Sequence, residues 1–392
     1  MIKNICVISK EYPSEKRAIY TFLEQLVNKF ADYNINCYVI SPQSLTQALI
    51  RKKPIEKKKY YRYNKNGKRV TIYSPYYLTF SKLTKIINTH YPYFSNFEIT
   101  TKRVFKKLNK KIKFDVIYAH FIYPSAIIAN KLGKKYNIPV FFAYGEDTNY
   151  TINYLGRKTT RKLLKGINGV ISVSESNKKR LIKNDIVPKS IIRVFPNGID
   201  NNIFYKKNKK EMRKKLGYSE NNFIIIFVGR FKETKGINRL CEALNIINNN
   251  NIKAIFIGEG QLKPDYKNTI FEGKLAHNEI TDYLSASDIF VLPTNAEGCC
   301  NAIIEALACG LPVISSNKSF NDEILDETCS IRIDEMNVTE IKEAILELYN
   351  NKEKRKRFSN AALKKSKQFN IDNRTKKILE FMENKMKRIE SK

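Results

Sequence analysis

Strand-sized apolar segments alternate with longer amphipathic segments along most of the chain. The apolar segments, such as FIIIFV at 223–228, are rich in β-branched and aromatic residues, which is typical of buried strands. The segments between them, such as 19–30, carry apolar residues at helical spacing. Strands separated by helices form parallel βαβ units. The pattern therefore predicts an α/β protein with doubly wound parallel sheets.

The expected elements fall into two groups of similar size. In the first group we expect strands at 3–9, 36–40, 114–119, 139–143, 169–173 and 191–195. We expect helices at 19–30 and at 174–182, and a further helix that follows the strand at 114–119 and ends at Leu132. In the second group we expect strands at 223–228, 253–257, 268–271, 288–292 and 312–315, and helices at 238–249, 277–286 and 301–309. A charged amphipathic helix is expected at 372–389.

The segment PNGID at 196–200 separates the two groups. Its composition is typical of a turn, and the polar, charged run that follows it shows no strand pattern. A chain of 392 residues is long enough for two domains. We expect one Rossmann-like domain at 1–195 and a second at 196–371, facing each other across a cleft, with the helix at 372–389 packing back on the first domain.

The apolar segments are too short to cross a membrane. The longest of them are strand-sized, whereas a membrane helix needs about 18 or more apolar residues in a row. The N-terminal segment MIKNICVISKEYP reads as a first strand and not as a signal peptide, because its short apolar run leads directly into polar sequence. These features predict a cytoplasmic protein.

Basic residues give the chain a net charge of +33 and cluster in its first half. Segment 51–69 holds ten basic residues against one acidic residue, and segment 101–113 holds seven against none. Such clusters attract polyanions, either nucleic acid or an anionic membrane leaflet. A solvated helix face or a mobile loop is the alternative. Because no nucleic-acid recognition motif occurs, we expect an anionic membrane surface as the partner and no nucleic acid.

The cysteines do not form a metal-binding pattern. No CxxC pair occurs and the three histidines lie far from the cysteines, whereas structural zinc needs four closely spaced N or S ligands. We therefore expect reduced, buried cysteines and no metal site. The seven cysteines are Cys6, Cys37, Cys241, Cys299, Cys300, Cys309 and Cys329.

The segment VGRFKETKG at 228–236 is a candidate diphosphate site. A strand ends there, Gly229 turns the chain, and Arg230 and Lys235 project from the loop that leads into a helix. Guanidinium and ammonium groups at a strand-to-helix turn suit phosphate oxygens. The segment is neither a Walker A loop nor a GxGxxG loop, which disfavours a P-loop NTPase or a dehydrogenase. A second turn, IGEG at 257–260, carries glycines that let backbone approach a ligand closely.

The segment AEGCCNAIIEALACGLPVISS at 296–316 carries two glutamates eight positions apart. Glu297 precedes the expected helix and Glu305 lies within it, while Gly298, Cys299, Cys300 and Asn301 supply backbone N–H groups at the helix start. Carboxylates accept hydrogen bonds from sugar hydroxyls. Basic residues for phosphates combined with glutamates for hydroxyls are the pattern expected of a nucleotide-sugar site.

Taken together, these motifs resemble the retaining GT-B glycosyltransferases of family 4, the group 1 transferases. The resemblance runs in order from SVSESNKKRL and PNGID through VGR…KG, IGEG and HNEITDYLSASDIFVLPTNAEG to EALACGLPVISS. It implies a GT-B fold with an N-terminal acceptor-binding domain and a C-terminal domain for the nucleotide-sugar donor. It also implies that Arg230 and Lys235 hold the diphosphate, Glu305 the ribose and Glu297 the transferred sugar.

The resemblance extends to the first half through DVIYAHF. It implies a catalytic position for His120 near the reaction centre, the alternative being a histidine that only packs at a strand end. Tyr144 and Asp147 of the segment YGED are carried over as acceptor-cleft residues, although relatives often have HGxD there. The first loop, SEKRAIY at 14–20, lacks the paired glycines of many relatives. No DxD motif occurs, so we expect no metal cofactor.

The sequence thus predicts a hexosyltransferase that moves a sugar from a nucleotide-sugar donor to a glycan or a lipid-linked acceptor, with retention of configuration. Uridine and guanosine diphosphate remain open as the nucleotide. The resemblance points to assembly of a bacterial surface polysaccharide at the inner face of the cell membrane. Two other interpretations are a non-catalytic GT-B partner subunit and a basic nucleic-acid-binding protein.

Overall fold

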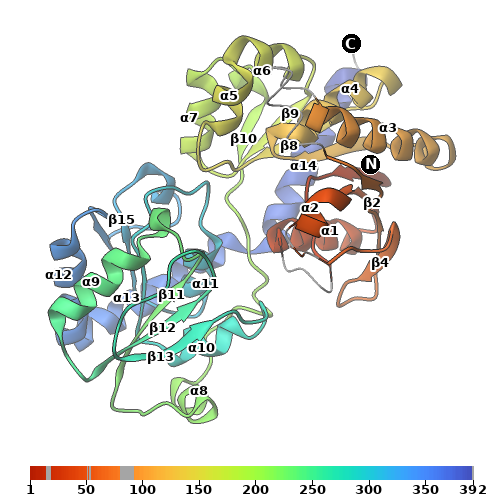
Figure 1. The fold of residues 1–392 in the computed structure, drawn as a ribbon. Coiled ribbons are helices and arrows are strands. Elements are labelled where there is room, and N and C mark those ends of the chain that lie inside the picture. The colour runs from red at the N-terminus through yellow and green to blue at the C-terminus, as the bar shows by residue number, and fades with distance from the viewer. Residues whose placement is uncertain (15–18, 51, 53, 80–91, 391–392) are drawn as a thin grey trace. The chain divides into compact units, whose positions relative to one another are not determined.

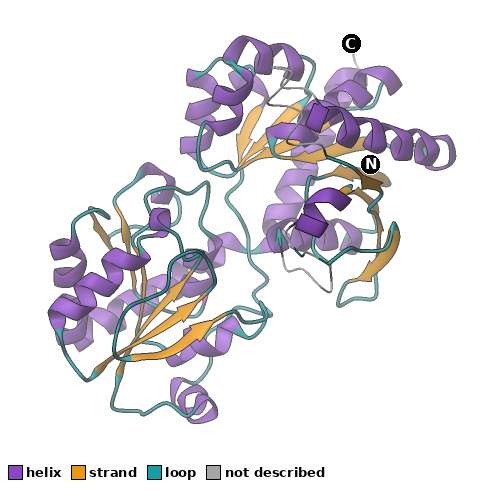
Figure 2. Ribbon diagram, in the orientation of Figure 1, coloured by secondary structure: helices purple, strands orange, loops and turns teal. Residues whose placement is uncertain are grey.

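The computed structural model describes residues 1–14, 19–50, 52, 54–79 and 92–390 (Figure 1). The chain divides into two compact units. The first unit, called the N unit here, comprises Met1–Phe195 together with Asp372–Lys392, and the second, the C unit, comprises Pro196–Ile371. Each unit is a parallel sheet with helices on its faces (Figure 2). The α/β fold with doubly wound sheets is therefore confirmed.

The N unit is built on an eight-stranded sheet with the order β10-β9-β8-β7-β1-β2-β5-β4. Its strands are β1 (Asn4–Ile8), β2 (Asn36–Ile40), β4 (Lys59–Tyr63), β5 (Arg69–Tyr73), β7 (Val116–His120), β8 (Val140–Tyr144), β9 (Gly169–Ser172) and β10 (Ile192–Val194). A separate parallel pair joins β3 (Gln43–Ser44) to β6 (Tyr76–Tyr77). Every neighbour in the large sheet is parallel except β4, which pairs antiparallel with β5.

Helices cover both faces of this sheet because its strands are apolar on both sides. Along β1, Ile5 and Val7 belong to the core beneath α1 and α14, whereas Cys6 and Ile8 belong to the core beneath α3 and α4. The helices of the N unit are α1 (Thr21–Asp32), α2 (Leu45–Ile50), α3 (Pro92–Ile112), α4 (Ile127–Tyr136), α5 (Tyr150–Leu155), α6 (Arg157–Leu164), α7 (Glu175–Lys183) and α14 (Ile371–Glu390).

The C unit is built on a six-stranded, all-parallel sheet with the order β13-β12-β11-β14-β15-β16. Its strands are β11 (Phe223–Val228), β12 (Ile252–Ile257), β13 (Thr269–Gly273), β14 (Ile289–Leu292), β15 (Val313–Ser316) and β16 (Ser330–Ile333). Its helices are α8 (Lys209–Leu216), α9 (Ile237–Ile247), α10 (Ile280–Ala286), α11 (Asn301–Ala308), α12 (Val338–Asn350) and α13 (Lys352–Ser366). One continuous hydrophobic core joins these elements.

The basic segments are more ordered than their composition suggests. Segment 51–69, for which a solvated helix face or a mobile loop was the alternative to an anion-binding surface, contains β4, which forms a hairpin with β5; Arg51 and Lys53 lie outside the described residues. Its exposed basic side chains occupy the sheet edge, where charge protects unpaired strand groups, while Val70 and Ile72 of β5 are fully buried. The polar run after 196–200 likewise contains helix α8, whose N-cap is Asn208.

Among the residues that the structure describes, no helix combines the length and the apolar character that crossing a membrane requires.

Candidate functional site

The strand order of the C unit places a topological switch point between β11 and β14. Starting from β11, the chain moves outward through β12 and β13 on one side and then returns to place β14, β15 and β16 on the other. The loops after β11 and β14 therefore diverge at the carboxyl ends of two neighbouring parallel strands, and ligands of doubly wound sheets bind at such a switch point. These two loops, 229–236 and 293–300, carry most of the predicted donor residues.

The loop 229–236 contacts the loop 293–300 at a glycine. Gly236 follows the short 3-10 turn Glu233–Lys235 and has a φ of 72°. A Cβ atom at this position would lie 2.2 Å from the carbonyl oxygen of Pro293, so only glycine allows the two backbones to approach this closely. The contact continues at Thr234, whose carbonyl oxygen accepts a hydrogen bond of 3.0 Å from the N–H of Asn295.

This approach brings two of the predicted residues together. The ammonium group of Lys235 forms an ion pair with the carboxylate of Glu297 and donates a hydrogen bond of 3.3 Å to the carbonyl oxygen of Ala296. The two charged side chains are only 15% and 16% exposed, so water screens the pair weakly. Arg230, in the same first loop, is exposed. A cation and a carboxylate thus meet at the switch point, with a second cation in the same loop as the first.

Glu305 lies in the second turn of α11 and is almost fully buried. Its Oε1 lies 2.9 Å from Nε2 of His277, whose ring packs against Phe204 with ring centroids 4.9 Å apart. The partner His277 precedes α10 by a few residues and was not identified from the sequence. Its place in the motif HNEITDYLSASDIFVLP was the only sequence signal for a role of this histidine. The contact with Glu305 itself left no such signal, because 28 positions separate the two residues.

The start of α11 is held by the segment PNGID at 196–200, which was expected to separate the two domains. Asn197 belongs to the C unit and donates from its side-chain Nδ2 to Oδ1 of Asn301 at 2.8 Å. Its backbone N–H donates to Sγ of Cys299 at 3.4 Å. Asn197 therefore fixes the backbone of the predicted donor-binding residues, a positioning role that sequence reasoning missed.

Two cysteine thiols near this loop, those of Cys300 and Cys309, are buried and uncharged, whereas Cys299 is half-buried. Burial raises the pKa of Cys300 well above its ordinary value and that of Cys309 to about 12. Both groups therefore stay protonated at neutral pH, whereas a thiol must ionise to ligate a metal or act as a nucleophile. Within the described parts of the chain, no cluster of three or more His, Cys, Asp or Glu side chains could hold a metal ion.

The glycines of the IGEG turn contact protein and not an open space. A Cβ atom on Gly258 would lie 1.9 Å from the carbonyl oxygen of Gly229, and one on Gly260 would lie 2.0 Å from that of Phe231. The N–H of Phe231 donates to the carbonyl oxygen of Glu259 at 2.8 Å. These glycines therefore let the turn support the backbone around Arg230, and a ligand contact of the turn stays a prediction.

The buried side chain of Arg239 forms hydrogen bonds and an ion pair with residues of both loops. Arg239 of α9 donates through Nε to the carbonyl oxygen of Glu335 at 2.7 Å and through Nη2 to that of Pro293 at 3.3 Å. It also forms an ion pair with Glu233, at the start of the turn that carries Lys235. Arg239 thus acts as a positioning residue for both loops.

The N unit presents its own switch point, between β1 and β7, and His120 is the last residue of β7. The ring is 6% exposed and packs against Phe22 and Phe121, with centroids 5.0 and 4.3 Å away. Its buried Nδ1 atom has no hydrogen-bond partner among the described residues. Phe121 has a φ of 65°, a strained value for a non-glycine residue and one that is frequent at functional sites.

Burial lowers the pKa of His120 to about 3, and the charge of Arg374 adds to the effect. The unfolded chain binds a proton near pH 6.5 whereas the folded chain does not, so this histidine lowers the stability of the fold as pH falls below about 6.5. Between pH 7 and pH 5 the loss is on the order of 2 kcal/mol. We expect His120→Phe to abolish this part of the acid destabilisation, measured by urea unfolding at both pH values; an unchanged pH dependence would contradict the buried neutral state.

The other predicted residues of the N unit follow β8. Tyr144 is fully buried, and burial together with the charge of Glu146 raises its pKa to about 12, whereas Asp147 is exposed. Arg180 of α7 donates to the backbone oxygens of Glu146, at 2.6 Å, and Asp147, at 3.3 Å. The SVSESNKKRL motif thus anchors this loop through Arg180. An acceptor contact for Tyr144 stays a prediction, and it requires the loop to uncover the hydroxyl.

Two family descriptions match the chain over consecutive regions. Residues 208–365 match "Glycosyl transferases group 1", and residues 21–202 match "Glycosyltransferase Family 4". The two regions together take in both sheets apart from β1, and they include the loops 229–236 and 293–300.

Known proteins and solved structures show the same similarity. TuaC of Bacillus subtilis, a glycosyltransferase assigned to teichuronic acid biosynthesis, is 28% identical over 321 residues, which cover 79% of this chain and 80% of TuaC. UDP-Gal:alpha-D-GlcNAc-diphosphoundecaprenol alpha-1,3-galactosyltransferase of Escherichia coli is 29% identical over 55% of this chain and 61% of that protein. The structure of Anabaena HepE in complex with UDP superimposes with a TM-score of 0.72 at 17% identity, over 97% of this chain and 100% of HepE, which shows a shared fold.

Proposed function

Because the chain is a group 1 glycosyltransferase with the GT-B fold, we propose that it transfers a sugar, with retention of configuration, from a nucleoside diphosphate donor to a glycan or lipid-linked acceptor. Assembly of a bacterial surface polysaccharide is the proposed setting. The names of the relatives from Bacillus subtilis and Escherichia coli support this setting, since they refer to teichuronic acid and to a diphosphoundecaprenol-linked sugar.

The observation that carries the proposal is the Lys235–Glu297 pair at the switch point of the C unit. In the proposed complex the donor diphosphate takes the ammonium group of Lys235 as its partner, with Arg230 binding from the same loop. The carboxylate of Glu297 is then available to accept hydrogen bonds from the hydroxyls of the transferred sugar. The two members of this ion pair thereby bind the two parts of the donor: Lys235 binds the diphosphate and Glu297 binds the transferred sugar.

The nucleotide is proposed to bind along the start of α11. Glu305 would accept hydrogen bonds from the ribose hydroxyls, in an orientation fixed by His277. Backbone N–H groups from Gly298 to Asn301 would face the sugar and phosphates, because the first N–H groups of a helix have no partner within it. Asn197 holds this backbone in place.

The chemistry of transfer then needs few groups. The acceptor hydroxyl oxygen bonds to the anomeric carbon, the bond from that carbon to the diphosphate oxygen breaks, and the hydroxyl proton passes to the departing oxygen on the same face. Arg230 and Lys235 stabilise the charge that develops on the diphosphate, so we propose that no metal cofactor is required. His120, neutral at every working pH, is proposed to hydrogen-bond the sugar, and Tyr144 and Asp147 the acceptor.

A thermal-shift screen against nucleoside diphosphate sugars tests the donor class. A donor present at 100 times its Kd stabilises the fold by about 2.7 kcal/mol, which gives a shift of several degrees. We expect uridine or guanosine diphosphate sugars to raise the Tm in the presence of EDTA, and NMR of the transfer product to show a retained anomeric configuration. No shift with any nucleotide sugar would refute the donor assignment, and an inverted product would refute retention.

Glu305→Gln is the matched variant for this screen. The amide keeps the shape of the carboxylate but replaces one acceptor oxygen with a donor, so one ribose hydrogen bond is lost. We expect binding of the nucleoside diphosphate to weaken about tenfold while binding of inorganic pyrophosphate stays unchanged. Equal weakening of both ligands would argue against a ribose contact.

Membrane docking is proposed from two features of the N unit. A shallow pocket of about 200 Å³ lies between α3 and α4 and is lined by Lys102, Arg103, Lys106, Lys131, Leu132, Lys135 and Tyr136. Glu98 pairs with Lys102 and Lys131, and the remaining cations, which form no ion pair among the residues that the structure describes, can meet anionic headgroups. At the end of α2, Leu49 and Ile50 are 72% and 78% exposed. Basic and exposed apolar side chains together suit the inner membrane face.

Vesicle flotation measures this docking. We expect the protein to float with phosphatidylglycerol vesicles at low salt and to be released at high salt, because each basic residue near the surface contributes about 1 kcal/mol. Replacing Arg103, Lys106 and Lys135 by Gln is expected to abolish flotation. The same change at Lys352, Lys356 and Arg357 of α13 removes equal charge from the C unit and serves as the control; equal loss in both variants would contradict a specific surface.

A further inference from the structure

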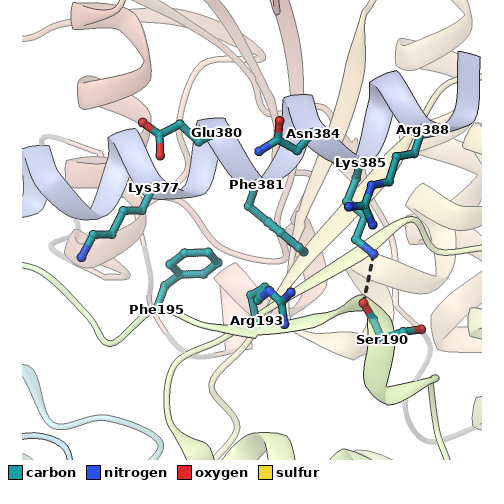
Figure 3. A pocket seen from close by; sticks show the side chains of 9 residues that line it. All are labelled: Ser190, Arg193, Phe195, Lys377, Glu380, Phe381, Asn384, Lys385 and Arg388. Atoms are coloured by element: carbon teal, nitrogen blue, oxygen red, sulfur yellow. Dashed lines mark hydrogen bonds between the residues drawn. The ribbon is translucent and has the colours of Figure 1, made fainter. Parts of the chain in front are cut away.

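A second pocket lies in the N unit, between the C-terminal helix α14 and the strand at the sheet edge, β10 (Figure 3). Its volume is about 370 Å³. The lining side chains come from α14 and from the short segment around β10: Ser190, Arg193, Phe195, Lys377, Glu380, Phe381, Asn384, Lys385 and Arg388. None of these residues belongs to the proposed donor or acceptor sites.

The floor of the pocket is aromatic and rigid. The rings of Phe195 and Phe381 are 5.7 Å apart and inclined at 53°. Phe381 is only 9% exposed and packs on its inner side against Phe141 of β8, at 6.0 Å. The floor therefore belongs to the core of the unit and offers an apolar surface that is already in place.

The wall of the pocket is cationic. Arg193, Lys385 and Arg388 lie close together at one end, and Lys385 donates a hydrogen bond of 3.0 Å to the carbonyl oxygen of Ser190 (Figure 3). Lys377 lies toward the other end, where Glu380 is the single acidic lining residue. None of these three cations forms an ion pair with an acidic side chain among the described residues.

The cationic cluster is not electrostatically balanced. Burial lowers the pKa of Lys385, and the neighbouring charges of Arg388 and Arg193 lower it further. Some cations on other surfaces of this unit have acidic partners, as Lys131 has in Glu98. Like charges held together in this way are unfavourable on their own, whereas a bound anion would pair with all of them at once.

We propose that this pocket binds a phosphate group, with the guanidinium groups of Arg193 and Arg388 and the ammonium group of Lys385 as its ligands. Guanidinium groups bind two phosphate oxygens at once, and a lysine adds a point charge. The Phe195–Phe381 floor receives the apolar part of the ligand that carries the phosphate. The phosphate is that of a soluble phosphorylated compound or of a lipid headgroup, and this site is separate from the donor site of the C unit.

Calorimetry with inorganic pyrophosphate tests the site. The titration is carried out in a Lys235→Ala background, because the donor site is expected to bind the same ion. In that background we expect one pyrophosphate bound per chain, with at least tenfold weaker binding when Arg193, Lys385 and Arg388 are all replaced by Gln. The control replaces Lys183, Lys376 and Lys387, which lie outside the pocket on α7 and α14, and is expected to change affinity less than twofold.

Vesicles distinguish the two sources of phosphate. If the pocket variant loses affinity for pyrophosphate, the ligand is a soluble phosphorylated compound; if it loses affinity only for phosphatidylglycerol vesicles, relative to phosphatidylcholine, the ligand is a lipid headgroup. Either result supports the site. Unchanged binding of both probes in the pocket variant, or an equal loss in the control variant, overturns the proposal. Failure here leaves the donor-site assignment intact, because the two sites share no residue.

Discussion

Replacing Lys235 by alanine is expected to lower kcat/KM for sugar transfer by about 10²–10³-fold. The ammonium group is the cation that the structure places directly beside Glu297, and it is proposed to neutralise the diphosphate as the glycosidic bond breaks. Removal of one such preorganised electrostatic partner costs about 3–4 kcal/mol in comparable sites. We also expect the Kd for the nucleoside diphosphate to rise, because Lys235 binds the ground state as well.

Lys232→Ala is the control for this prediction. Lys232 lies in the same loop, three positions earlier, and is exposed. Its removal changes the net charge by the same amount without touching the Lys235–Glu297 pair. Steady-state kinetics of transfer or of donor hydrolysis distinguishes the two variants. An equal effect of both changes would mean that Lys235 acts only through the general positive field of the protein.

Glu297→Gln is expected to lower kcat by about 10²-fold without weakening the binding of the nucleoside diphosphate. The amide keeps the size of the carboxylate but accepts weaker hydrogen bonds from the sugar hydroxyls near the anomeric carbon. It also frees Lys235 from its ion pair, so the diphosphate no longer competes with a carboxylate for the ammonium group. The affinity for the nucleoside diphosphate is therefore expected to stay the same or to increase.

The two variants are thus expected to differ in nucleotide affinity, which falls only in Lys235→Ala, and calorimetry with the nucleoside diphosphate measures this difference directly. The double variant Lys235→Ala/Glu297→Gln completes a cycle, and the partners of one ion pair should show non-additive effects. If Glu297→Gln weakens nucleotide binding as strongly as Lys235→Ala does, Glu297 contributes to the diphosphate site and not to the sugar site.

The fold was predictable because a strand that is buried on both faces of a sheet is a continuous apolar segment of the sequence. Segments such as 223–228 are apolar at every position, as a strand between two helical layers must be, and β11 occupies that range without a shift. The boundary at 195/196 was likewise visible, because turn composition interrupts the alternation. The hairpin of β4 was missed because this edge strand consists of charged residues and tyrosines and therefore lacks the apolar pattern of a buried strand.

The site was predictable only in part. Lys235 and Glu297 could be proposed because each follows a strand, and the carboxyl ends of parallel strands meet at one edge of the sheet. His277 and Asn197 could not be found in the same way, since their contacts join residues 28 and 104 positions apart. Such contacts depend on how separate loops pack, and that packing has no local signature.

By itself, the sequence determined the order of the buried strands and the helices between them, the two sheets, and the positions of the cations and carboxylates relative to strand ends, because these follow from local burial and from connection rules. Only the tertiary structure decided that Lys235 pairs with Glu297, that Gly258 and Gly260 serve backbone contacts, and that α14 covers a cationic pocket. The physical reason is that burial leaves a periodic pattern along the chain, whereas a specific pairing of side chains arises when distant segments are brought within a few ångströms.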